Sequence, residues 1–351
     1  MTVTKVIGHG PPAGPAPQTH ARMATNFCAP DALAVFKSQR GGCSQVDWEE
    51  RVAAALPRQS PVTYVNVGAN KGYKVPAFLA LWSQQHVPGY VGGWQHHLIK
   101  YATEHKSGFL KRFSCGNCND CKAKPPAAHN RDGGRMHLFE LASANRELLR
   151  YVIEAERLGD RVQLHNLAAS NTTHQLSVFK DLMAGDERGQ ALTGAKAARF
   201  KKADASTMVP AVALDDFFRA QRLSHIYHVA VDTEGWDALV VEGMRGALSR
   251  REISLLEFEV NNRGMWNRYT AGREVRTVEG TLSMLHAAGY RCFWVLTKSL
   301  LPASGQCWLD AYAGRPEWSN MLCAHEPPVL EVLDGIAREG YAARQNGARG
   351  R

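Results

Sequence analysis

The chain of 351 residues lacks the long apolar run that a membrane-spanning helix requires, because no segment approaches about 18 consecutive apolar residues. Its first residues also lack the apolar core of a secretory signal peptide. We therefore expect neither a membrane span nor a signal peptide, which leaves the cytoplasm as the default compartment. Hydrophobic residues make up 44% of the chain, which suffices for one large α/β domain with additions.

The formal net charge of +9 permits an anionic partner without requiring one. Basic residues gather in residues 106–124 and 199–202 and are otherwise spread along the chain. Such blocks are typical of solvated loops, and nucleic-acid binding is the second interpretation. No RNP-type aromatic motif or helix-turn-helix pattern accompanies the charge, so nucleic acid is not the favoured partner.

The residue pattern divides the chain into four parts. Residues 1–26, rich in Pro, Ala and Gly, predict a disordered leader, and residues 27–60 predict a helical segment. In residues 61–333, strand patterns alternate with helix patterns, which indicates an α/β domain with a doubly wound, mostly parallel sheet. Residues 88–135 form a basic, cysteine-containing insertion in that domain, and residues 181–207 form a polar loop. Residues 334–351 are a weakly patterned tail.

The segment V-N-V-G-A-N-K-G at residues 65–72 ends a predicted strand and begins a predicted helix. Glycine lets the backbone approach a ligand closely, and the first N–H groups of a helix have no partner within it. The spacing of Gly68 and Gly72 differs from the G-x-G-x-x-G of dinucleotide-binding proteins and from the Lys-Ser/Thr ending of a P-loop. The segment therefore predicts a site for a nucleotide-like molecule, with an ordinary strand–helix turn as the alternative.

A carboxylate partner for this turn follows from the position of the next strand. Ribose-binding folds carry an acid at the end of that strand, about 20 residues beyond the glycines. Glu140 ends a predicted strand 68 residues beyond Gly72, and removing the 48 residues of the insertion leaves 20. We therefore predict that Glu140 accepts hydrogen bonds from ribose hydroxyls, an ordinary strand-end glutamate being the alternative.

Five segments of the chain resemble, in the same order, the FkbM family of class I S-adenosylmethionine-dependent methyltransferases. They are V-N-V-G-A-N-K-G-Y at 65–73, F-E-L-A-S-A-N at 139–145, V-Q-L-H-N-L-A-A-S at 162–170, V-A-L-D-D-F at 212–217 and V-D-T-E-G-W-D-A-L-V-V-E-G-M at 231–244. The resemblance implies a Rossmann-like, seven-stranded, mostly parallel sheet with a reversed C-terminal hairpin. It also implies that S-adenosyl-L-methionine binds across the carboxyl ends of the strands.

The same resemblance assigns donor-binding residues by position. The glycine turn would face the amino-acid part of the cofactor, Glu140 would take the ribose, and the end of the third strand would border the adenine. The predicted cofactor-binding residues are Asn66, Gly68, Ala69, Asn70, Gly72, Glu140, Leu167 and Ala168. Two positions differ from the family's pattern: Asn66 replaces an aspartate, which removes a carboxylate near the positive sulfonium, and Leu141 replaces a proline.

Methyl transfer is an in-line displacement in which the protein aligns donor and acceptor and removes a proton where needed. Acceptor-side groups are expected where the strand beside the glycine turn ends, at D-T-E-G in residues 232–235. We predict that Asp232, Glu234 and, from the next strand, Glu259 orient or deprotonate the acceptor, or bind a metal that does so. The alternative for Glu234 and its neighbour Asp237 is that they cap the following helix.

Three cysteines of the insertion, Cys115, Cys118 and Cys121, follow a C-x2-C-x2-C pattern. Two-residue spacing lets neighbouring thiolates converge on one metal, which predicts a structural zinc site if a fourth ligand exists. A disulfide-linked insertion is the alternative, with Cys28–Cys43 as a second bridge and an oxidising compartment implied. Free thiols are the third possibility.

The leading functional hypothesis is O-methylation of a hydroxyl on a small molecule, a sugar or a glycan. The first alternative is an RNA methyltransferase, motivated by the net charge and the basic insertion. The second is a catalytically inert binding protein that keeps the methyltransferase fold, motivated by Asn66.

Overall fold

The computed structural model describes residues 27–56, 62–82, 90–105, 118, 133–179, 206–266, 275–313 and 318–349. The expected leader, the expected loop up to residue 205 and most of the expected insertion lie outside these residues. Among the described helices, none combines the length and the apolar character needed to cross a membrane.

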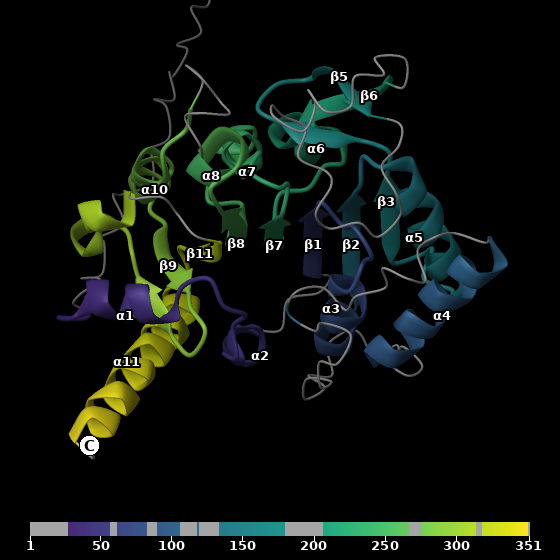
Figure 1. The fold of residues 1–351 in the computed structure, drawn as a ribbon. Helices are drawn as coiled ribbons and strands as arrows, with labels where there is room; N and C mark the ends of the chain where they lie inside the picture. The colour runs from purple at the N-terminus through teal and green to yellow at the C-terminus, as the bar shows by residue number, and fades with distance from the viewer. Residues whose placement is uncertain are drawn as a thin grey trace, which may run out of the picture.

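An eight-stranded sheet forms the centre of the fold (Figure 1). Its strands are β1 (Val62–Val67), β2 (Gly134–Phe139), β3 (Val162–His165), β7 (Ile226–Val231), β8 (Ile253–Val260), β9 (Arg291–Val295), β10 (Leu300–Pro302) and β11 (Ser319–Ala324). They lie in the order β10-β9-β11-β8-β7-β1-β2-β3, and the neighbours from β8 to β3 run parallel. β11 runs antiparallel to both β8 and β9. The mostly parallel α/β architecture expected from the sequence is therefore present.

The expected count of seven strands is wrong, because β10 adds an eighth at the edge. It pairs antiparallel with β9, with Leu300 opposite Val295, and all three of its residues are buried. Pro302 has no N–H to donate, which an edge strand tolerates. A strand of three residues is too short to produce a recognisable alternating pattern, so the sequence did not reveal it.

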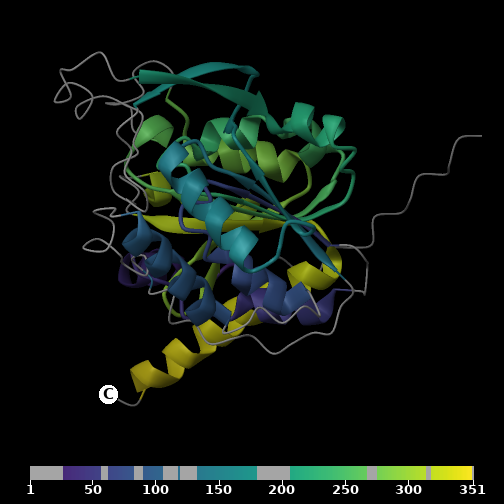
Figure 2. The ribbon, with the colours of Figure 1, turned by 90° about the vertical axis from the view of Figure 1, so that its right-hand side faces the viewer.

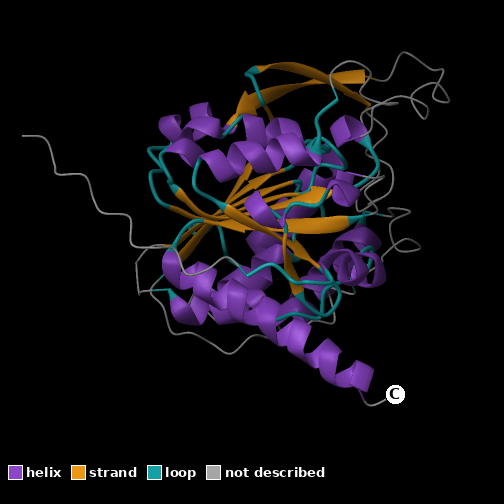
Figure 3. Cartoon of the chain, turned by 90° about the vertical axis from the view of Figure 1, so that its left-hand side faces the viewer, coloured by secondary structure: helices purple, strands orange, loops and turns teal. Residues whose placement is uncertain are grey.

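Helices cover both faces of the large sheet, and the sheet lies between two helical layers (Figure 3). The helices are α1 (Ala32–Gln39), α2 (Trp48–Ala55), α3 (Lys74–Trp82), α4 (Tyr90–Glu104), α5 (Ser143–Ala155), α6 (Leu214–Ala220), α7 (Asp237–Glu242), α8 (Arg245–Ser249), α10 (Val278–Ala287) and α11 (Pro327–Arg349). Short 3-10 turns are η3 (Gly264–Trp266), η5 (Gly305–Cys307) and η6 (Asp310–Ala313).

Alternation along β1 explains the two apolar cores. Val65 and Val67 contribute to the core beneath α1, α6, α7, α8 and α10, whereas Val62 and Tyr64 contribute to the core beneath α2, α3, α4, α5 and α11. Every residue of β1 is buried, as expected of a central strand covered on both faces.

A second, three-stranded sheet of β4 (Ala168–Ser170), β5 (His174–Phe179) and β6 (Ser206–Ala213) lies outside one helical layer (Figure 2). The chain passes from the large sheet to the small one between His165, where β3 ends, and Ala168, where β4 begins. Gly243, after α7, allows the close approach of β4, because a Cβ there would lie 2.0 Å from the carbonyl oxygen of Ser170.

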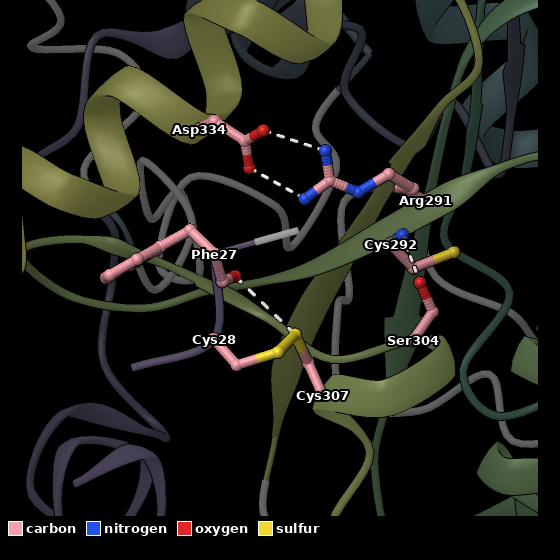
Figure 4. The surroundings of a disulfide bond; sticks show 7 residues. All are labelled: Phe27, Cys28, Arg291, Cys292, Ser304, Cys307 and Asp334. Atoms are coloured by element: carbon pink, nitrogen blue, oxygen red, sulfur yellow. Dashed lines mark hydrogen bonds and ion pairs between the residues drawn. A yellow bond between two sulfur atoms is a disulfide. The ribbon is translucent and has the colours of Figure 1, made fainter. Parts of the chain in front are cut away.

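Two segments differ from their expected character. Within residues 88–135, α4 belongs to the core, because Trp94, Leu98 and Ala102 are fully buried. At the C-terminus, the expected tail continues α11 as far as Arg349. Asp334 of α11 accepts two hydrogen bonds from the guanidinium of Arg291 in β9, at 2.7 and 2.8 Å (Figure 4).

All six described cysteines form disulfides. The bonds are Cys28–Cys307, Cys43–Cys118 and Cys292–Cys323; Figure 4 shows the first. The expected Cys28–Cys43 bridge is therefore wrong, because each sulfur has a partner that is distant in sequence. Cys118 is bonded to Cys43 and is not a thiolate ligand for zinc, so the proposed zinc site has no support. Cys115 and Cys121 lie outside the described residues.

Candidate functional site

A cleft of about 730 Å³ opens over the carboxyl ends of β1, β2, β7 and β8. This is the point where the chain's order along the sheet reverses, and open α/β sheets bind their ligands at such a point. The volume is in the range of pockets that enclose small ligands. All eleven residues that the sequence assigned to cofactor binding or catalysis line this one cleft: Asn66, Gly68, Ala69, Asn70, Gly72, Glu140, Leu167, Ala168, Asp232, Glu234 and Glu259.

The glycine turn needs both of its glycines for backbone geometry and packing. Gly68 has φ +86°, and a Cβ there would lie 1.9 Å from the carbonyl oxygen of Asp232. Gly72 has φ +73°, and its Cβ would meet Leu149 at 2.6 Å and Trp94 at 2.8 Å. The turn is therefore pressed against the end of β7 on one side and against α4 and α5 on the other, which fixes the backbone that faces the cleft.

Glu140 is fastened to the same turn. Its carboxylate accepts a hydrogen bond from the backbone N–H of Asn70 and another from that of Ala142, each at 2.8 Å. Burial raises the pKa of Glu140, and these two hydrogen bonds oppose the rise. Glu140 thus lies beside the glycine turn, as the spacing argument predicted. Its carboxylate also holds the turn in shape.

Apolar side chains line the cleft beside Glu140. Phe139 and Leu141 flank Glu140, and Leu167 and Ala168 lie where the chain passes from β3 to the small sheet. Asn66 is buried in β1 between Leu138 of β2 and Ala230 of β7. A neutral amide avoids the desolvation cost that an aspartate would meet at this position.

On the other side of the glycine turn, Asp232 directly follows β7, and its backbone N–H donates to the carbonyl of Val67 at 2.9 Å. Its side chain is exposed to the cleft rather than enclosed. The surrounding walls nevertheless desolvate the carboxyl group, and the negative charges of Asp237, Glu234 and Glu257 add to this effect, so its pKa is raised.

The other two predicted catalytic carboxylates have protein partners. Glu234, in the left-handed region with φ +55°, forms an ion pair with Arg263. Glu259 is buried and accepts a hydrogen bond from the side-chain amide of Asn261 at 2.5 Å. Burial, followed by the charge of Asp232, raises the pKa of Glu259. Both side chains thus line the cleft in fixed positions.

Asp237, the first residue of α7, braces the turn before the helix, and no side chain that the structure describes caps the helix itself. Its carboxylate accepts from the backbone N–H groups of Thr233 at 3.4 Å, Gly235 at 3.1 Å and Glu259 at 3.2 Å. It is completely buried, and burial raises its pKa. Asp237 therefore ties the turn after β7 to β8 and does not face the acceptor space.

Glu257 is the cleft carboxylate that the sequence interpretation missed. It accepts a hydrogen bond from Asn320 of β11 at 2.9 Å and lies 3.4 Å from the ammonium of Lys74 and 3.6 Å from Nε2 of His228. Burial acts to raise the pKa of Glu257, but the charge of Lys74 and the hydrogen bond from Asn320 oppose it and the pKa is lowered. The period of two along β8 would have placed it on the same face as Glu259.

The described residues provide no support for a metal-dependent acceptor site. Among them, no group of three or more His, Cys, Asp or Glu side chains is arranged to hold a metal ion.

These features define a Rossmann-like α/β protein with a ligand cleft at the switch point of its sheet. The family model described as the methyltransferase FkbM domain matches residues 66–292, well over half of the chain. The chain therefore belongs to the FkbM methyltransferase family, as the sequence resemblance predicted.

Solved structures give a distant likeness. A methyltransferase FkbM from Methylobacillus flagellatus shares 11% identity over 82% of this chain and 49% of that chain, with a TM-score of 0.38. A protein of the NADB-Rossmann superfamily from Streptococcus agalactiae shares 9% identity over 80% and 69% of the two chains, with a TM-score of 0.30. The chain thus spans about half the length of the first of these structures. No curated protein sequence matches it significantly.

The part of the cleft over β1, β2 and β3, which we call the donor end, has groups that suit the cofactor implied by the family. Glu140 presents a carboxylate to hydroxyl groups, and Leu141 and Leu167 offer apolar surface for an aromatic base. The turn from Gly68 to Gly72 precedes α3, and its N–H groups already donate within the protein: those of Gly68 and Ala69 to Phe139, that of Asn70 to Glu140 and that of Gly72 to Ala69. The turn therefore offers a ligand a fixed backbone shape.

Proposed function

We propose that this protein is an S-adenosylmethionine-dependent methyltransferase that methylates a hydroxyl on a small molecule, a sugar or a glycan. One observation carries the proposal: a single cleft is lined by the glycine turn and Glu140, which follow β1 and β2, and by Asp232 and Glu259 at the ends of the neighbouring strands β7 and β8, which we call the acceptor end. Such an arrangement can hold a nucleoside-containing donor and an acceptor side by side, which is the main requirement for an in-line transfer.

When bound, S-adenosylmethionine supplies an activated methyl group and leaves as a neutral thioether. The residues of the donor end would bind and orient it. Glu140 would accept hydrogen bonds from the ribose hydroxyls, Leu167 and Ala168 would border the adenine, and the turn from Gly68 to Gly72 would hold the amino-acid part.

At the acceptor end, Asp232 would take up the proton that the acceptor hydroxyl loses. Its exposure to the cleft makes it reachable, and its raised pKa brings it closer to the range in which a general base works well near neutral pH. Glu234 and Glu259, held by Arg263 and Asn261, would orient the acceptor.

The test combines calorimetry with a transfer assay. We expect S-adenosylmethionine to bind, and radiolabelled methyl groups to pass from it to fractions of a cell extract containing hydroxylated metabolites and glycans. Asp232→Asn should keep donor binding and lose transfer by about 100-fold or more. Asp160→Asn, which alters an exposed aspartate outside the cleft, is the matched control.

Transfer by Asp232→Asn at the wild-type rate would refute the role of Asp232 while leaving the methyltransferase assignment intact. Absence of donor binding at millimolar concentration would refute the enzyme assignment. Donor binding without transfer to any fraction would instead favour the inert binding protein, for which Asn66 in place of the family's aspartate is the supporting observation.

A further inference from the structure

The acceptor end of the cleft combines indole, amide and carboxyl side chains. Trp236 precedes α7 and Trp318 precedes β11, and both residues are partly buried and line the cleft. Asn320, on β11, pairs with Glu259 of the neighbouring strand β8 and donates to the carboxylate of Glu257. These groups come from β7, β8 and β11, which are adjacent in the sheet.

Two cations of the protein neutralise two of the carboxylates at the acceptor end. Glu257 lies 3.4 Å from the ammonium of Lys74, and Glu234 is ion-paired with Arg263. Glu259 is buried, and its raised pKa favours the neutral, protonated form, whereas Asp232 is exposed to the cleft and serves as the base in its ionised form. An anionic ligand would therefore meet four carboxyl groups, while a cationic ligand would compete with Lys74 and Arg263, which already neutralise Glu257 and Glu234.

The hydrogen-bonding capacity of the same groups requires a ligand that both donates and accepts. An ionised carboxylate such as that of Glu257 only accepts, so its ligand must donate. The side-chain amide of Asn320 uses one hydrogen on Glu257, and its second hydrogen can serve a ligand acceptor. A hydroxyl group can both donate to Glu257 and accept from Asn320, whereas a phosphate oxygen can only accept from Asn320.

We propose that the acceptor is an uncharged saccharide unit, and this proposal rests on the proposed function. Its hydroxyls engage Asn320 and the carboxyl groups of Glu257 and Glu259, and an apolar face of its ring packs on Trp318. Indoles suit this role because they offer a large apolar surface at the edge of a polar site. The reaction breaks the O–H bond of one hydroxyl, with the proton passing to Asp232. The oxygen's electron pair forms the new bond to the methyl carbon, and the carbon–sulfur electron pair stays on sulfur.

Saturation-transfer NMR tests this without relying on turnover. The protein, saturated with S-adenosylhomocysteine, is mixed with the methyl glycosides of glucose, galactose, mannose and fucose, and separately with glucosamine and glucose 6-phosphate. We expect signals from at least one neutral glycoside, and methylation of the same glycoside when S-adenosylmethionine is supplied. Glucosamine and glucose 6-phosphate should bind about tenfold more weakly or not at all.

Variants of Trp318 supply the second readout. Trp318→Ala should weaken glycoside binding about tenfold, Trp318→Phe should restore most of it, and donor affinity by calorimetry should stay unchanged in both. If both variants weakened glycoside binding and donor binding equally, the assignment of Trp318 would be overturned. Stronger binding of either charged sugar than of every neutral one, or no neutral binding, would overturn the saccharide proposal. Loss of donor binding by the wild-type protein would instead mean that the proposed function itself fails.

Discussion

The two ends of the cleft are built in different ways. The donor end is mainly backbone: a turn of five residues from Gly68 to Gly72, held by one carboxylate, Glu140. The acceptor end is mainly side chains, brought together by β7, β8 and β11 from positions almost 90 residues apart, such as Asp232 and Asn320.

This difference determines what each end tolerates. A Cβ at Gly68 would collide with backbone, which cannot move away as a flexible side chain could. The acceptor end instead depends on charge balance between groups such as Glu257 and Lys74, and a shape-preserving substitution can change that balance. We therefore expect changes at the donor end to act on folding and donor binding together. Changes at the acceptor end should separate donor binding from acceptor chemistry.

The largest effect is expected from Gly68→Ala. The added Cβ would lie 1.9 Å from the carbonyl oxygen of Asp232, and φ +86° is unfavourable for any L side chain. We predict a loss of ~3 kcal/mol or more in the free energy of unfolding, measured by denaturant titration, together with loss of S-adenosylmethionine binding. Gly159→Ala is the control, because no atom lies within 4 Å of its Cβ position and the stability should be nearly unchanged. Equal stability of the two variants would contradict the packing argument.

Glu140→Ala should have the next largest effect. It leaves the buried N–H groups of Asn70 and Ala142 without their acceptor, which costs about 2–4 kcal/mol of unfolding free energy. Donor affinity should fall more than tenfold, since the ribose partner and the shape of the turn are lost together. Glu140→Gln keeps the side-chain volume and one acceptor oxygen, so its unfolding free energy should lie between that of the wild-type protein and that of Glu140→Ala. Calorimetry showing wild-type donor affinity in Glu140→Ala would exclude Glu140 from the donor site.

Asn66→Asp places a carboxylate where the family pattern has one. Because the position is buried, we expect a loss of about 1–3 kcal/mol in stability. A negative charge near a sulfonium should also raise the affinity for S-adenosylmethionine relative to the neutral S-adenosylhomocysteine. The ratio of the two dissociation constants, from calorimetry, measures this. An unchanged ratio would show that Asn66 does not face the sulfonium end.

The smallest effect concerns pH. The pKa values of Asp232, Asp237 and Glu259 are raised in the folded protein, so between roughly pH 4 and neutrality the folded state binds more protons than the unfolded state. Stability should therefore fall as pH rises through this window. In Glu259→Gln one of these protons is absent, and the melting temperature should fall less between pH 5 and pH 8. Parallel pH curves for the two proteins would contradict the raised pKa of Glu259.

The predictability of the two ends also differed. The residues predicted for the donor meet in the cleft because they belong to a contiguous motif and to one spacing, from Gly72 to Glu140, that is recognisable once the insertion is removed. Asp232 and Glu259 meet in the same cleft because they lie at the ends of adjacent buried strands. Glu257, Lys74 and Asn320 were missed, since their meeting depends on the order of strands in the sheet and on the start of α3. Trp318 has no pattern around it that indicates a cleft.

The cysteines also show that contacts between distant segments cannot be predicted from local sequence patterns. A C-x2-C spacing concerns neighbours in sequence, whereas Cys43–Cys118 joins residues 75 positions apart and Cys28–Cys307 joins residues 279 apart. No local pattern encodes such pairings, because they form only after the chain has brought the sulfurs together.

By itself, the sequence determined the family, the parallel α/β sheet, the glycine turn and its acid, because these depend on local backbone geometry and on periodic burial. Only the tertiary structure decided the eighth strand, the disulfide pairing and the partners of each carboxylate. Those depend on which distant segments touch, and charge balance in a cleft is a property of contacts rather than of residue order.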